Sequence, residues 1–405
     1  MKILINSFAC GPNWGSEVGM GWHWVTALSN HCQLYVITES GFEDDIKNIL
    51  HNLDLKYVPV FYYVNIGDKG RELFWQQGSF EFYKHYKNWQ KEAFKLANDI
   101  IKTQKIDIIH QLNMIGFREP GFLWQIDKPY VLGPLGGIDN FPNAFMGYLP
   151  FKNRIYSLLK NHYSNFQFKY LKRFHDACKK AEVIFTATND GFQRLKKIYS
   201  KKVILLNETG CEVRAIDNKD KNFEGILKII WVGRMEERKA LDLAIESLSN
   251  IKNKINFEFT IVGDGPMEDY YKKLIQKKNI QDKCKWKGRI QNDEVQYLMK
   301  KSHLFLFTSL REGTPHVVTE ALQNGLPVIC HNACGQGSVV TNDCGLKVDM
   351  ISPKISIDFF SECLVKLNKD RDLLKKMSDN AIKRALEVSW ENKAKEMFKI
   401  YKTFV

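Results

Sequence analysis

The sequence predicts an α/β protein made of two doubly wound, Rossmann-like domains. At 405 residues the chain is longer than a single hydrophobic core usually supports. Short apolar runs alternate with segments of helical periodicity in both halves, which is the order that a parallel sheet requires. A polar stretch over residues 213–226, rich in turn formers, separates the two halves. We therefore predict an N-terminal domain over 1–212 and a C-terminal domain over 227–388.

In the N-terminal half, the apolar runs end in turn residues or in a polar side chain. A glycine-rich loop after the first run leads into a helix through Leu28, and helical periodicity is also clear over 89–103. The run over 106–110 presents His110 at its carboxyl end, and the run over 130–137 ends in a glycine turn. Strands are predicted over 2–7, 33–38, 57–61, 106–110, 130–137, 183–187 and 203–206.

The alternation of strand and helix begins again after residue 226. Helices are predicted over 241–248 and 267–278, and another begins near residue 314. The segment 389–401 is amphipathic and reads as a final helix. Strands are predicted over 227–234, 257–262, 284–288, 303–308, 327–330 and 345–348.

Charge and cysteine content narrow the class of protein. Lys and Arg number 59 against 46 Asp and Glu, so the net charge of +13 favours an anionic partner such as phosphate, an anionic membrane surface or nucleic acid. Nine cysteines are spread along the chain without a Cys-x-x-Cys pair, which is typical of reduced cytosolic proteins. Cys330, Cys334 and Cys344 have an unusual spacing for a metal site, so we predict a structural role for them and no metal.

The chain has no sequence feature of export or membrane insertion. The apolar run over residues 1–6 is too short for a signal peptide. No segment approaches the roughly 18 uncharged apolar residues that a membrane-spanning helix needs. We expect a cytoplasmic protein that is able to lie peripherally on the inner face of the cell membrane.

Two glutamates on either side of a predicted helix start form the central candidate site. Thr314 is expected to cap that helix, with Pro315 at its first position. Glu312 then lies in the loop after the strand 303–308, and Glu320 lies about a turn and a half into the helix. Backbone N–H groups between them attract phosphate. Such a site suits a sugar nucleotide, with one carboxylate on the ribose and the other on the sugar; the alternative is two solvated glutamates.

Residues upstream in the same half strengthen this interpretation. Arg234 ends a predicted strand and Lys239 follows at the head of a helix, so both are placed to bind a diphosphate, unless they are ordinary surface charge. Gly263 lies in a tight turn that permits close backbone approach, or it forms a plain turn. No third glycine completes a Gly-x-Gly-x-x-Gly pattern, which disfavours a nicotinamide dinucleotide fold.

The loop after the first strand is a candidate site in the N-terminal half. Amides of Gly15 and Ser16 are placed to reach a phosphate, and Glu17 to reach a hydroxyl or an acceptor. His110 is a second candidate, with Asn113 and Arg118 close behind it, although a single histidine is often structural. The loop with Gly136 and Gly137 is a phosphate or acceptor loop, or a turn.

Aromatic and basic residues alternate over 61–94 and again over 141–175. This pattern is typical of interfacial membrane surfaces and of platforms for single-stranded nucleic acid. The alternative is a set of helices that bury aromatic faces. Of the two functional interpretations, the membrane surface is favoured.

Taken together, these motifs resemble the retaining nucleotide-sugar glycosyltransferases of family four. That family has the GT-B fold, in which two Rossmann-like domains face each other across a cleft. The N-terminal motifs resemble a bacterial branch involved in surface-polysaccharide synthesis. The motifs in question are Gly233-Arg234-x4-Lys239, Val262-Gly-Asp-Gly-Pro266, Glu312-x7-Glu320, Ala321-Leu-x-x-Gly325-x-Pro327-Val328, Gly15-Ser-Glu17 and Gly133-Pro-x-Gly-Gly137.

The resemblance implies a role for each candidate residue. Arg234 and Lys239 would bind the donor diphosphate, Glu320 the ribose, and Glu312 with the segment after it the transferred sugar. Glu312 and His110 are the candidate catalytic residues. The expected donor-binding residues are Gly15, Ser16, Arg234, Lys239, Gly263, Gly313, Thr314, Pro315, His316, Val317 and Glu320. The expected acceptor-binding residues are Glu17, Asn113, Arg118, Gly136 and Gly137.

The implied activity is the retaining, metal-independent transfer of a hexosyl or acetylhexosaminyl group. The donor would be a nucleotide-diphosphate sugar, used as co-substrate with no other cofactor, and the acceptor a glycan or lipid-linked hydroxyl in O-antigen, capsule or lipopolysaccharide synthesis. A nucleotide-sugar epimerase or hydrolase of GT-B architecture is the alternative, and a basic nucleic-acid-binding module a weaker one, since no nucleic-acid partner is expected.

Ala240 and Cys334-Gly-Gln-Gly depart from the family, which usually has glycine after Lys239. The final helix, about 389–405, would pack on the N-terminal domain.

Overall fold

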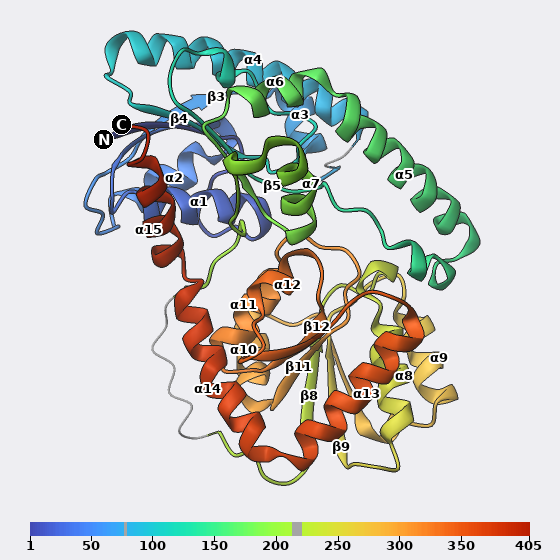
Figure 1. The fold of residues 1–405 in the computed structure, drawn as a ribbon. Helices are drawn as coiled ribbons and strands as arrows, with labels where there is room; N and C mark the ends of the chain where they lie inside the picture. Colours follow the sequence, from blue (N-terminus) through green and yellow to red (C-terminus); the bar gives the residue numbers. More distant parts are fainter. Residues whose placement is uncertain (77–78, 213–220) are drawn as a thin grey trace. The chain divides into compact units, whose positions relative to one another are not determined.

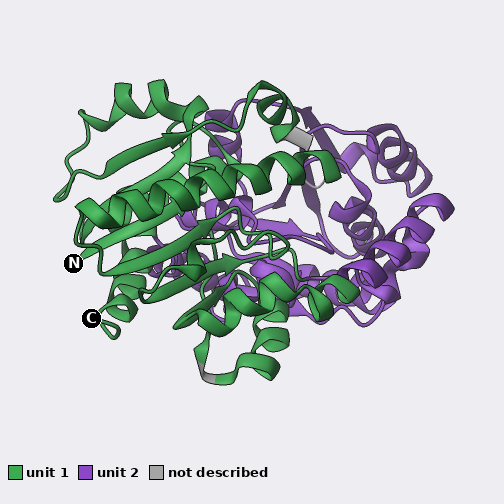
Figure 2. Cartoon of the chain, turned by 90° about the horizontal axis from the view of Figure 1, so that it is seen from above, with its two compact units in different colours: residues 1–138, 165–208, 390–405 green, residues 139–164, 209–389 purple. Residues whose placement is uncertain are grey.

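The computed structural model describes residues 1–76, 79–212 and 221–405. The chain divides into two compact units (Figure 2). Unit 1 comprises residues 1–138, 165–208 and 390–405. Unit 2 comprises residues 139–164 and 209–389.

The units cross the predicted domain limits in two places. Residues 139–164 and 209–212 were expected in the N-terminal domain, but they belong to unit 2. Phe141 and Phe145 lie in the hydrophobic core of unit 2, and the Phe145 ring meets His331 at a centroid distance of 5.7 Å. The composition of 139–164 gave no sign of this packing, because the residues that receive its aromatic side chains lie far along the chain. Most of the predicted linker, 213–220, lies outside the described residues.

Unit 1 contains a parallel sheet in the order β3-β2-β1-β4-β5-β6-β7 (Figure 1). The order reverses beside β1, so the crevice at the carboxyl ends of β1 and β4 is where such sheets bind ligands. The inner strands are buried along their whole length, as expected for a sheet covered on both faces. The strands are β1 Lys2–Ser7, β2 Gln33–Glu39, β3 Val60–Val64, β4 Ile108–Asn113, β5 Tyr130–Leu135, β6 Val183–Thr186 and β7 Val203–Leu205.

Helices connect these strands, and the last helix of the chain returns to unit 1. Trp390 of that helix, α15, meets Trp24 of α1 edge to face at 5.7 Å between centroids. Further along α15, Tyr401 reaches the strand β4. The helices of unit 1 are α1 Ser16–Leu28, α2 Glu43–Leu50, α3 Asp68–Glu72, α4 Phe80–Thr103, α6 Lys172–Lys180, α7 Asn189–Tyr199 and α15 Trp390–Tyr401. A further helix, α5 Phe151–Tyr170, contributes its first part to unit 2 and its last six residues to unit 1.

Unit 2 contains a parallel sheet in the order β10-β9-β8-β11-β12-β13. The reversal falls beside β8, so the carboxyl ends of β8 and β11 border the expected ligand crevice of this unit. The strands are β8 Leu227–Val232, β9 Phe257–Val262, β10 Cys284–Gly288, β11 Leu304–Phe307, β12 Val328–His331 and β13 Gly345–Val348. The helices are α8 Leu241–Ile251, α9 Glu268–Lys277, α10 Asn292–Lys301, α11 His316–Gln323, α12 Cys334–Val339, α13 Pro353–Lys369 and α14 Arg371–Glu387.

Three predicted element limits need correction. The third strand begins at Val60 rather than at residue 57, because Pro59 has no N–H to donate to the ladder. The helix predicted from 89 begins at Phe80, where the Ser79 hydroxyl accepts from the N–H of Phe82 at 3.1 Å. The strand expected to end at His110 continues to Asn113. Within the described part of the chain, no helix has the length and apolar content to cross a bilayer.

Candidate functional site

The candidate site of unit 2 lies at the carboxyl ends of β8 and β11. After β8 the chain forms a short 3-10 helix, Glu237–Lys239, and after β11 it forms the loop that leads to α11. The two segments are tied together by their backbones. Leu310 donates its N–H to the carbonyl of Arg238 at 2.8 Å, and the Thr308 hydroxyl donates to the carbonyl of Lys239 at 2.8 Å. The predicted residues Lys239 and Glu312 are thereby brought to one edge of the sheet.

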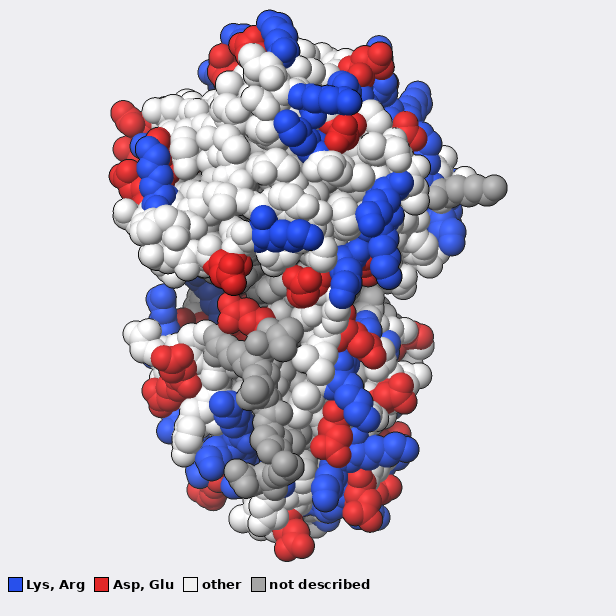
Figure 3. Space-filling view, turned by 90° about the vertical axis from the view of Figure 1, so that its left-hand side faces the viewer, with Lys and Arg blue, Asp and Glu red and all other residues white. Residues whose placement is uncertain are grey.

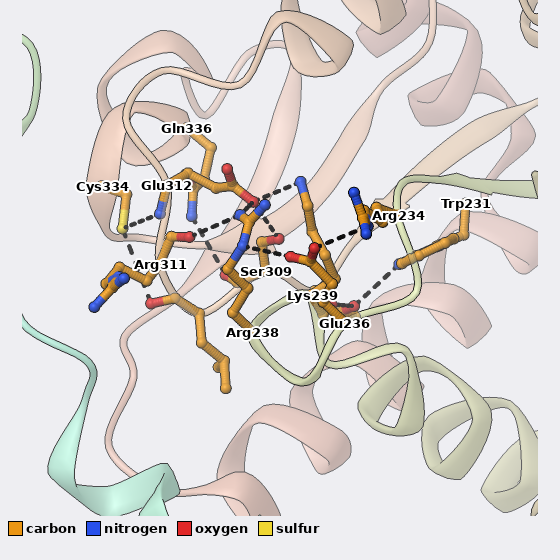
Figure 4. A network of polar contacts seen from close by, with 12 residues as sticks. Trp231, Arg234, Glu236, Arg238, Lys239, Ser309, Arg311, Glu312, Cys334 and Gln336 are labelled. Carbon is orange, nitrogen blue, oxygen red and sulfur yellow. Dashed lines mark hydrogen bonds and ion pairs between the residues drawn. The ribbon is translucent and has the colours of Figure 1, made fainter. Parts of the chain in front are cut away.

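The Glu312 carboxylate is the centre of this arrangement. One oxygen, Oε1, lies 2.6 Å from Lys239 Nζ and 2.7 Å from Arg238 Nη1, and it accepts from the Ser309 hydroxyl at 2.8 Å (Figure 4). Burial raises the pKa of Glu312. The charges of Lys239 and Arg238 lower it by more than burial raises it, so the pKa lies below its usual value. The carboxylate is therefore ionised at neutral pH, and it is the ion-pair partner of Lys239, whose side chain is largely buried.

A second carboxylate, Glu236, joins the cluster. Its Oε1 lies 3.0 Å from Arg234 Nε, and its Oε2 lies 2.9 Å from Arg238 Nε. Arg238 is thus shared between Glu236 and Glu312, whereas the Arg234 side chain is 68% exposed. Arg234 is the cation of the cluster that solvent and ligands reach most easily.

The cluster carries an excess of positive charge. Burial, and next the charge of Arg238, lower the pKa of Arg311, as expected where cations are crowded together. Asp139 is a further acidic side chain whose charge acts on Arg311, but the cations still outnumber the carboxylates around them, so the cluster favours an anionic ligand. The members are Arg234, Arg238, Lys239, Arg311, Glu236, Glu312 and Asp139.

Gly263 lets the backbones of two strands approach each other beside the cluster. Its φ is +123°, and an added Cβ would lie 2.0 Å from the carbonyl oxygen of Gly233. No side chain fits that space. The turn after β9 therefore presses against the segment that carries Arg234, which accounts for the glycine at this position.

The start of α11 differs from the prediction. Thr314 was expected to cap the helix with Pro315 at its first position, but Pro315 has an extended backbone, with φ −71° and ψ 120°, and the helix begins at His316. Gly335 supports this loop: its N–H donates to the carbonyl of Gly313 at 2.9 Å, and an added Cβ would lie 2.4 Å from the Cα of Thr314. That packing places Pro315 outside the helix.

Glu320 occupies the position that the spacing predicts. It is the fifth residue of α11, about one and a half turns from the start, and is partly exposed. Val317 and His316 in the first turn are also partly exposed, while Thr314 is buried. The start of α11 thus presents the predicted segment at the same sheet edge as Glu312.

Several residues of the site were missed by sequence reasoning. The N–H of Glu312 donates to Cys334 Sγ at 3.4 Å, and Gln336 Nε2 donates to the carbonyl of Ser309 at 3.5 Å. Gln336 is fully buried, and its Oε1 has no hydrogen-bond partner among the described residues. Arg238 could have been found from the sequence as the neighbour of Lys239. Cys334 and Gln336 lie more than 20 residues after Glu312 and its loop, and only the folding of the chain brings them into contact.

Ala240 has a backbone conformation that favours glycine, the residue expected at this position from the resemblance. Its φ of 46° and ψ of 49° lie in the left-handed region, and the residue is buried. An alanine there is strained by about 1 kcal/mol relative to glycine. The departure from the family is therefore tolerated at a cost in stability and leaves the position of Lys239 intact.

The predicted N-terminal candidates all lie in unit 1. Gly15 and Ser16 are exposed at the start of α1, in a different unit from Arg234, Lys239 and Glu312. Burial raises the pKa of Glu17 to about 7, although the N–H of Ile115, which donates to Glu17 Oε1 at 2.5 Å, lowers it in part. Glu17 is therefore positioned by the chain just after β4.

The predicted acceptor residues gather around the same chain segment. Gly136 donates its N–H to the carbonyl of Ile115 at 2.7 Å, and Gly137 has a φ of +71°. Arg118 Nη1 lies 3.9 Å from where a Cβ of Gly137 would be. Asn113, by contrast, is fully buried and bonds both backbone groups of Ala9, at 3.1 and 2.6 Å, so it joins β1 to β4.

His110 requires a correction. The side chain is fully buried in the middle of β4, with Nε2 2.6 Å from the carbonyl of Gly133 and Nδ1 2.6 Å from the hydroxyl of Tyr401. Burial lowers the pKa of His110 to about 4, so the ring is neutral. Because a carbonyl only accepts, Nε2 carries the hydrogen and Nδ1 accepts from Tyr401. The ring has no surface for a substrate, and we assign it a structural role rather than the predicted catalytic one.

The described residues contain no group of three or more His, Cys, Asp or Glu side chains placed to hold a metal ion. Cys330 and Cys344 are buried beside each other in the core of unit 2 with Cys334 at the site.

Comparison with known families bears on the unit that holds this cluster. Residues 213–384 match the family described as glycosyl transferases group 1. The matched residues belong to unit 2. The cluster of Arg234, Lys239 and Glu312 lies inside the matched range, and so does Glu320.

Curated relatives match parts of the chain. Protein CapJ of Staphylococcus aureus is 25% identical over 267 residues, which cover 62% of this chain and 61% of CapJ. The amylovoran biosynthesis glycosyltransferase AmsK of Erwinia amylovora is 33% identical over 116 residues, 27% of this chain and 28% of AmsK. The matched part of the chain thus spans less than two thirds of the length of either relative.

Solved structures show the fold. The crystal structure of HepE from Anabaena in complex with UDP matches with a TM-score of 0.59 over 100% of both chains, at 12% identity. Two parallel α/β sheets with this strand order, each reversed beside its first strand, make the fold that of GT-B glycosyltransferases. The fold class predicted from the sequence is confirmed.

Replacing Gly263 by alanine should destabilise unit 2. The new Cβ would clash with the Gly233 carbonyl at a φ that favours glycine, so we expect a loss of about 2–4 kcal/mol in the free energy of unfolding. Urea denaturation monitored by circular dichroism measures it. Gly147→Ala is the matched control, because Gly147 has open space around its Cβ position and no positive φ. Equal stability of the two variants would contradict the close approach.

Replacing Tyr401 by phenylalanine should leave His110 Nδ1 without its donor. A buried acceptor without a partner costs about 1–3 kcal/mol. Denaturation of the variant should show this loss, whereas Tyr57→Phe, at a partly exposed ring, should leave stability almost unchanged. A Tyr401→Phe variant as stable as the parent would show that the hydroxyl does not hold His110.

Replacing Glu17 by glutamine should change stability in a pH-dependent way. The pKa of Glu17 is raised in the folded protein to about 7, so its contribution to stability is present below its unfolded pKa and is lost as the pH rises through 7. Glutamine keeps the acceptor for Ile115 and does not ionise. We expect Glu17→Gln to raise Tm by roughly 2–6 °C at pH 8 and to have little effect at pH 5.

Thermal melts at both pH values measure the effect. The control is Glu396→Gln, at an exposed position of α15 in the same unit. A gain in Tm that is equal at pH 5 and pH 8 would contradict the raised pKa.

Proposed function

We propose that this protein is a retaining glycosyltransferase. It moves a hexosyl or acetylhexosaminyl group from a nucleotide-diphosphate sugar to a hydroxyl of a glycan or lipid-linked acceptor in bacterial surface-polysaccharide synthesis. The observation that carries the proposal is the Glu312 carboxylate held by Lys239 and Arg238 at the carboxyl edge of the unit 2 sheet. Three comparisons support the proposal: the match of residues 213–384 to glycosyl transferases group 1, the amylovoran biosynthesis glycosyltransferase among the relatives, and the UDP bound by HepE.

The cations of the cluster suit the donor diphosphate. Arg234 is the most exposed of them, and its planar guanidinium bonds two oxygens of a phosphate at once. Lys239 adds a point charge from a largely buried place, where solvent screens it little. The excess of cations over carboxylates in the cluster favours a diphosphate without a metal ion, which is the basis for proposing metal-independent transfer.

Glu312 and the residues after it suit the two ends of the donor. An ionised carboxylate only accepts hydrogen bonds, so Glu312 is suited to hydroxyls of the transferred sugar. The start of α11, from Gly313 to Val317, has the orientation in which helix amides attract phosphate. Glu320, further along α11 and partly exposed, is suited to the ribose hydroxyls.

The proposed reaction exchanges one bond at the anomeric carbon of the sugar. The bond from that carbon to the diphosphate oxygen breaks, and a bond to the acceptor oxygen forms on the same face. The departing diphosphate takes the proton of the acceptor hydroxyl, so no protein nucleophile is needed. Arg234 and Lys239 stabilise the negative charge that grows on the diphosphate as it leaves. Gly15, Ser16, Glu17, Arg118, Gly136 and Gly137 of unit 1 remain the proposed contacts for phosphate and acceptor.

Two variants test the division of roles. Lys239→Met should lose nucleotide binding, seen as loss of the thermal stabilisation that nucleotide diphosphates give by mass action. Glu312→Gln should keep that stabilisation but lower the rate of transfer by roughly 100-fold or more, because it removes the charge that orients the sugar. Lys273→Met, at an exposed position of α9, is the matched control and should behave as the parent protein.

The assay is a panel of nucleotide diphosphates and their sugars, followed by sugar transfer to a membrane extract containing lipid-linked glycans. Parent-level transfer by both site variants would overturn the site. Consumption of a donor at the same rate with and without acceptor would overturn transfer in favour of an epimerase or hydrolase.

A further inference from the structure

Helix α5 exposes a continuous apolar face, which we call the α5 face. Its members recur every three or four residues, so they lie on one side of the helix. The exposed fraction of the side chains is high for such large apolar groups, with Phe151 at 75%, Leu159 at 65% and Phe166 at 55%. The α5 face consists of Phe151, Ile155, Leu159, Tyr163, Phe166 and Tyr170.

The opposite side of α5 fixes the helix in this orientation. Asn161 Nδ2 donates to the carbonyl of Phe141 at 2.8 Å, and its Oδ1 accepts from the Phe141 N–H at 3.0 Å. Asn161 and Phe168 are buried, whereas the α5 face points away from both. A rotation that hid the apolar face would break these bonds and expose Phe168. The chain is therefore built to keep six large apolar residues in solvent.

The charge of α5 differs from that of the rest of the protein. The segment 151–170 contains Lys152, Arg154, Lys160 and Lys169 but no Asp or Glu, although the chain has 46 acidic residues. On the face drawn in Figure 3, by contrast, acidic and basic side chains are mixed. Glu237 accepts from Asn153 near the start of α5, but every Lys, Arg, Asp or Glu on the helix itself is a cation, so its apolar stripe fits an anionic surface.

The other aromatic and basic segment behaves differently, which corrects the prediction made for it. Over 61–94, the large aromatic residues Phe74, Phe82, Tyr86 and Trp89 are buried in the core of unit 1. They pack there because α4 covers the sheet, although Phe80 at the start of α4 is 89% exposed. Among the described residues of the two segments, the longer exposed aromatic face lies on α5.

We propose that the α5 face docks on a bilayer that contains anionic phospholipid. Twenty residues of helix give a contact about 30 Å long. The Phe, Leu and Ile side chains enter the boundary between head groups and acyl chains, and Tyr163 and Tyr170 keep their hydroxyls at head-group level. Lys and Arg extend along the apolar surface to the lipid phosphates. A second copy of this chain is a poorer occupant, since two faces of cations would repel each other.

Docking would place the protein on the leaflet that carries a lipid-linked acceptor. That consequence rests on the proposed function, but the docking itself does not. It is measured without donor or acceptor, so its failure and the failure of glycosyl transfer can be told apart.

The experiment is co-sedimentation of the purified protein with vesicles, at about 0.1 M salt, where surface charges are partly screened. We expect binding to vesicles of phosphatidylcholine with phosphatidylglycerol and none to phosphatidylcholine alone. Lys152→Gln, Arg154→Gln and Lys160→Gln together should weaken binding on the order of a hundredfold. The matched control replaces Lys273, Lys277 and Lys300 by glutamine, which removes the same charge from exposed helix positions elsewhere and should leave binding almost unchanged.

A second pair of variants tests the apolar contribution. Leu159→Ser with Phe166→Ser should abolish binding, whereas Tyr297→Ser with Ile351→Ser, at residues 58% and 62% exposed elsewhere in unit 2, should not. Circular dichroism verifies that each variant is folded. The proposal is overturned if the parent protein does not bind anionic vesicles, or if the control and α5 variants weaken equally. It is also overturned if ultracentrifugation shows a dimer that Leu159→Ser with Phe166→Ser dissociates.

Discussion

The site of unit 2 depends on one buried carboxylate held between two cations. Glu312 accepts from Lys239, Arg238 and Ser309, and these partners come from the loops after two adjacent strands. Removing Glu312 would take the carboxylate partner from Lys239, and removing the two cations would leave Glu312 without one; both side chains are largely buried, where an unpaired charge is far more costly than at the surface. The pairing therefore fixes the two loops relative to each other, and the exposed Arg234 and the start of α11 take their places from it.

The sequence was sufficient for most of the fold and for the centre of the site. Alternating apolar runs and helical segments predicted two parallel sheets, because both periodicities are local properties of the chain, whereas the order of the strands comes from the structure. Arg234, Lys239, Gly263, Glu312 and Glu320 were found because the resemblance supplied their spacing. Cys334 and Gln336 could not be found, since they reach the Glu312 loop from after a different strand and carry no local pattern of their own.

Where the sequence misled, burial was the missing quantity. His110 is of a residue type that often acts as a catalytic base, and it lies near the carboxyl end of a strand. The hydroxyl of Tyr401, almost 300 residues later in the chain, nevertheless bonds its Nδ1 within the core. The two aromatic and basic segments have similar composition, but α4 packs Phe82, Tyr86 and Trp89 into the core of unit 1, whereas α5 turns most of its aromatic side chains outward. Helical periodicity shows that a face exists; only the fold shows what covers it, as the residues over 139–164 also demonstrate.

The return of α15 to unit 1 has a consequence for how the protein is made. Unit 1 is assembled from three separate stretches, and its core includes Trp390, Met397 and Tyr401. Those residues leave the ribosome only after all of unit 2 has been synthesised. Unit 2 is therefore able to complete its core before unit 1 does. Until α15 is synthesised, the residues of unit 1 that pack against it stay uncovered and His110 lacks the Tyr401 hydroxyl. An incompletely covered core of this kind is prone to aggregation, which chaperones prevent.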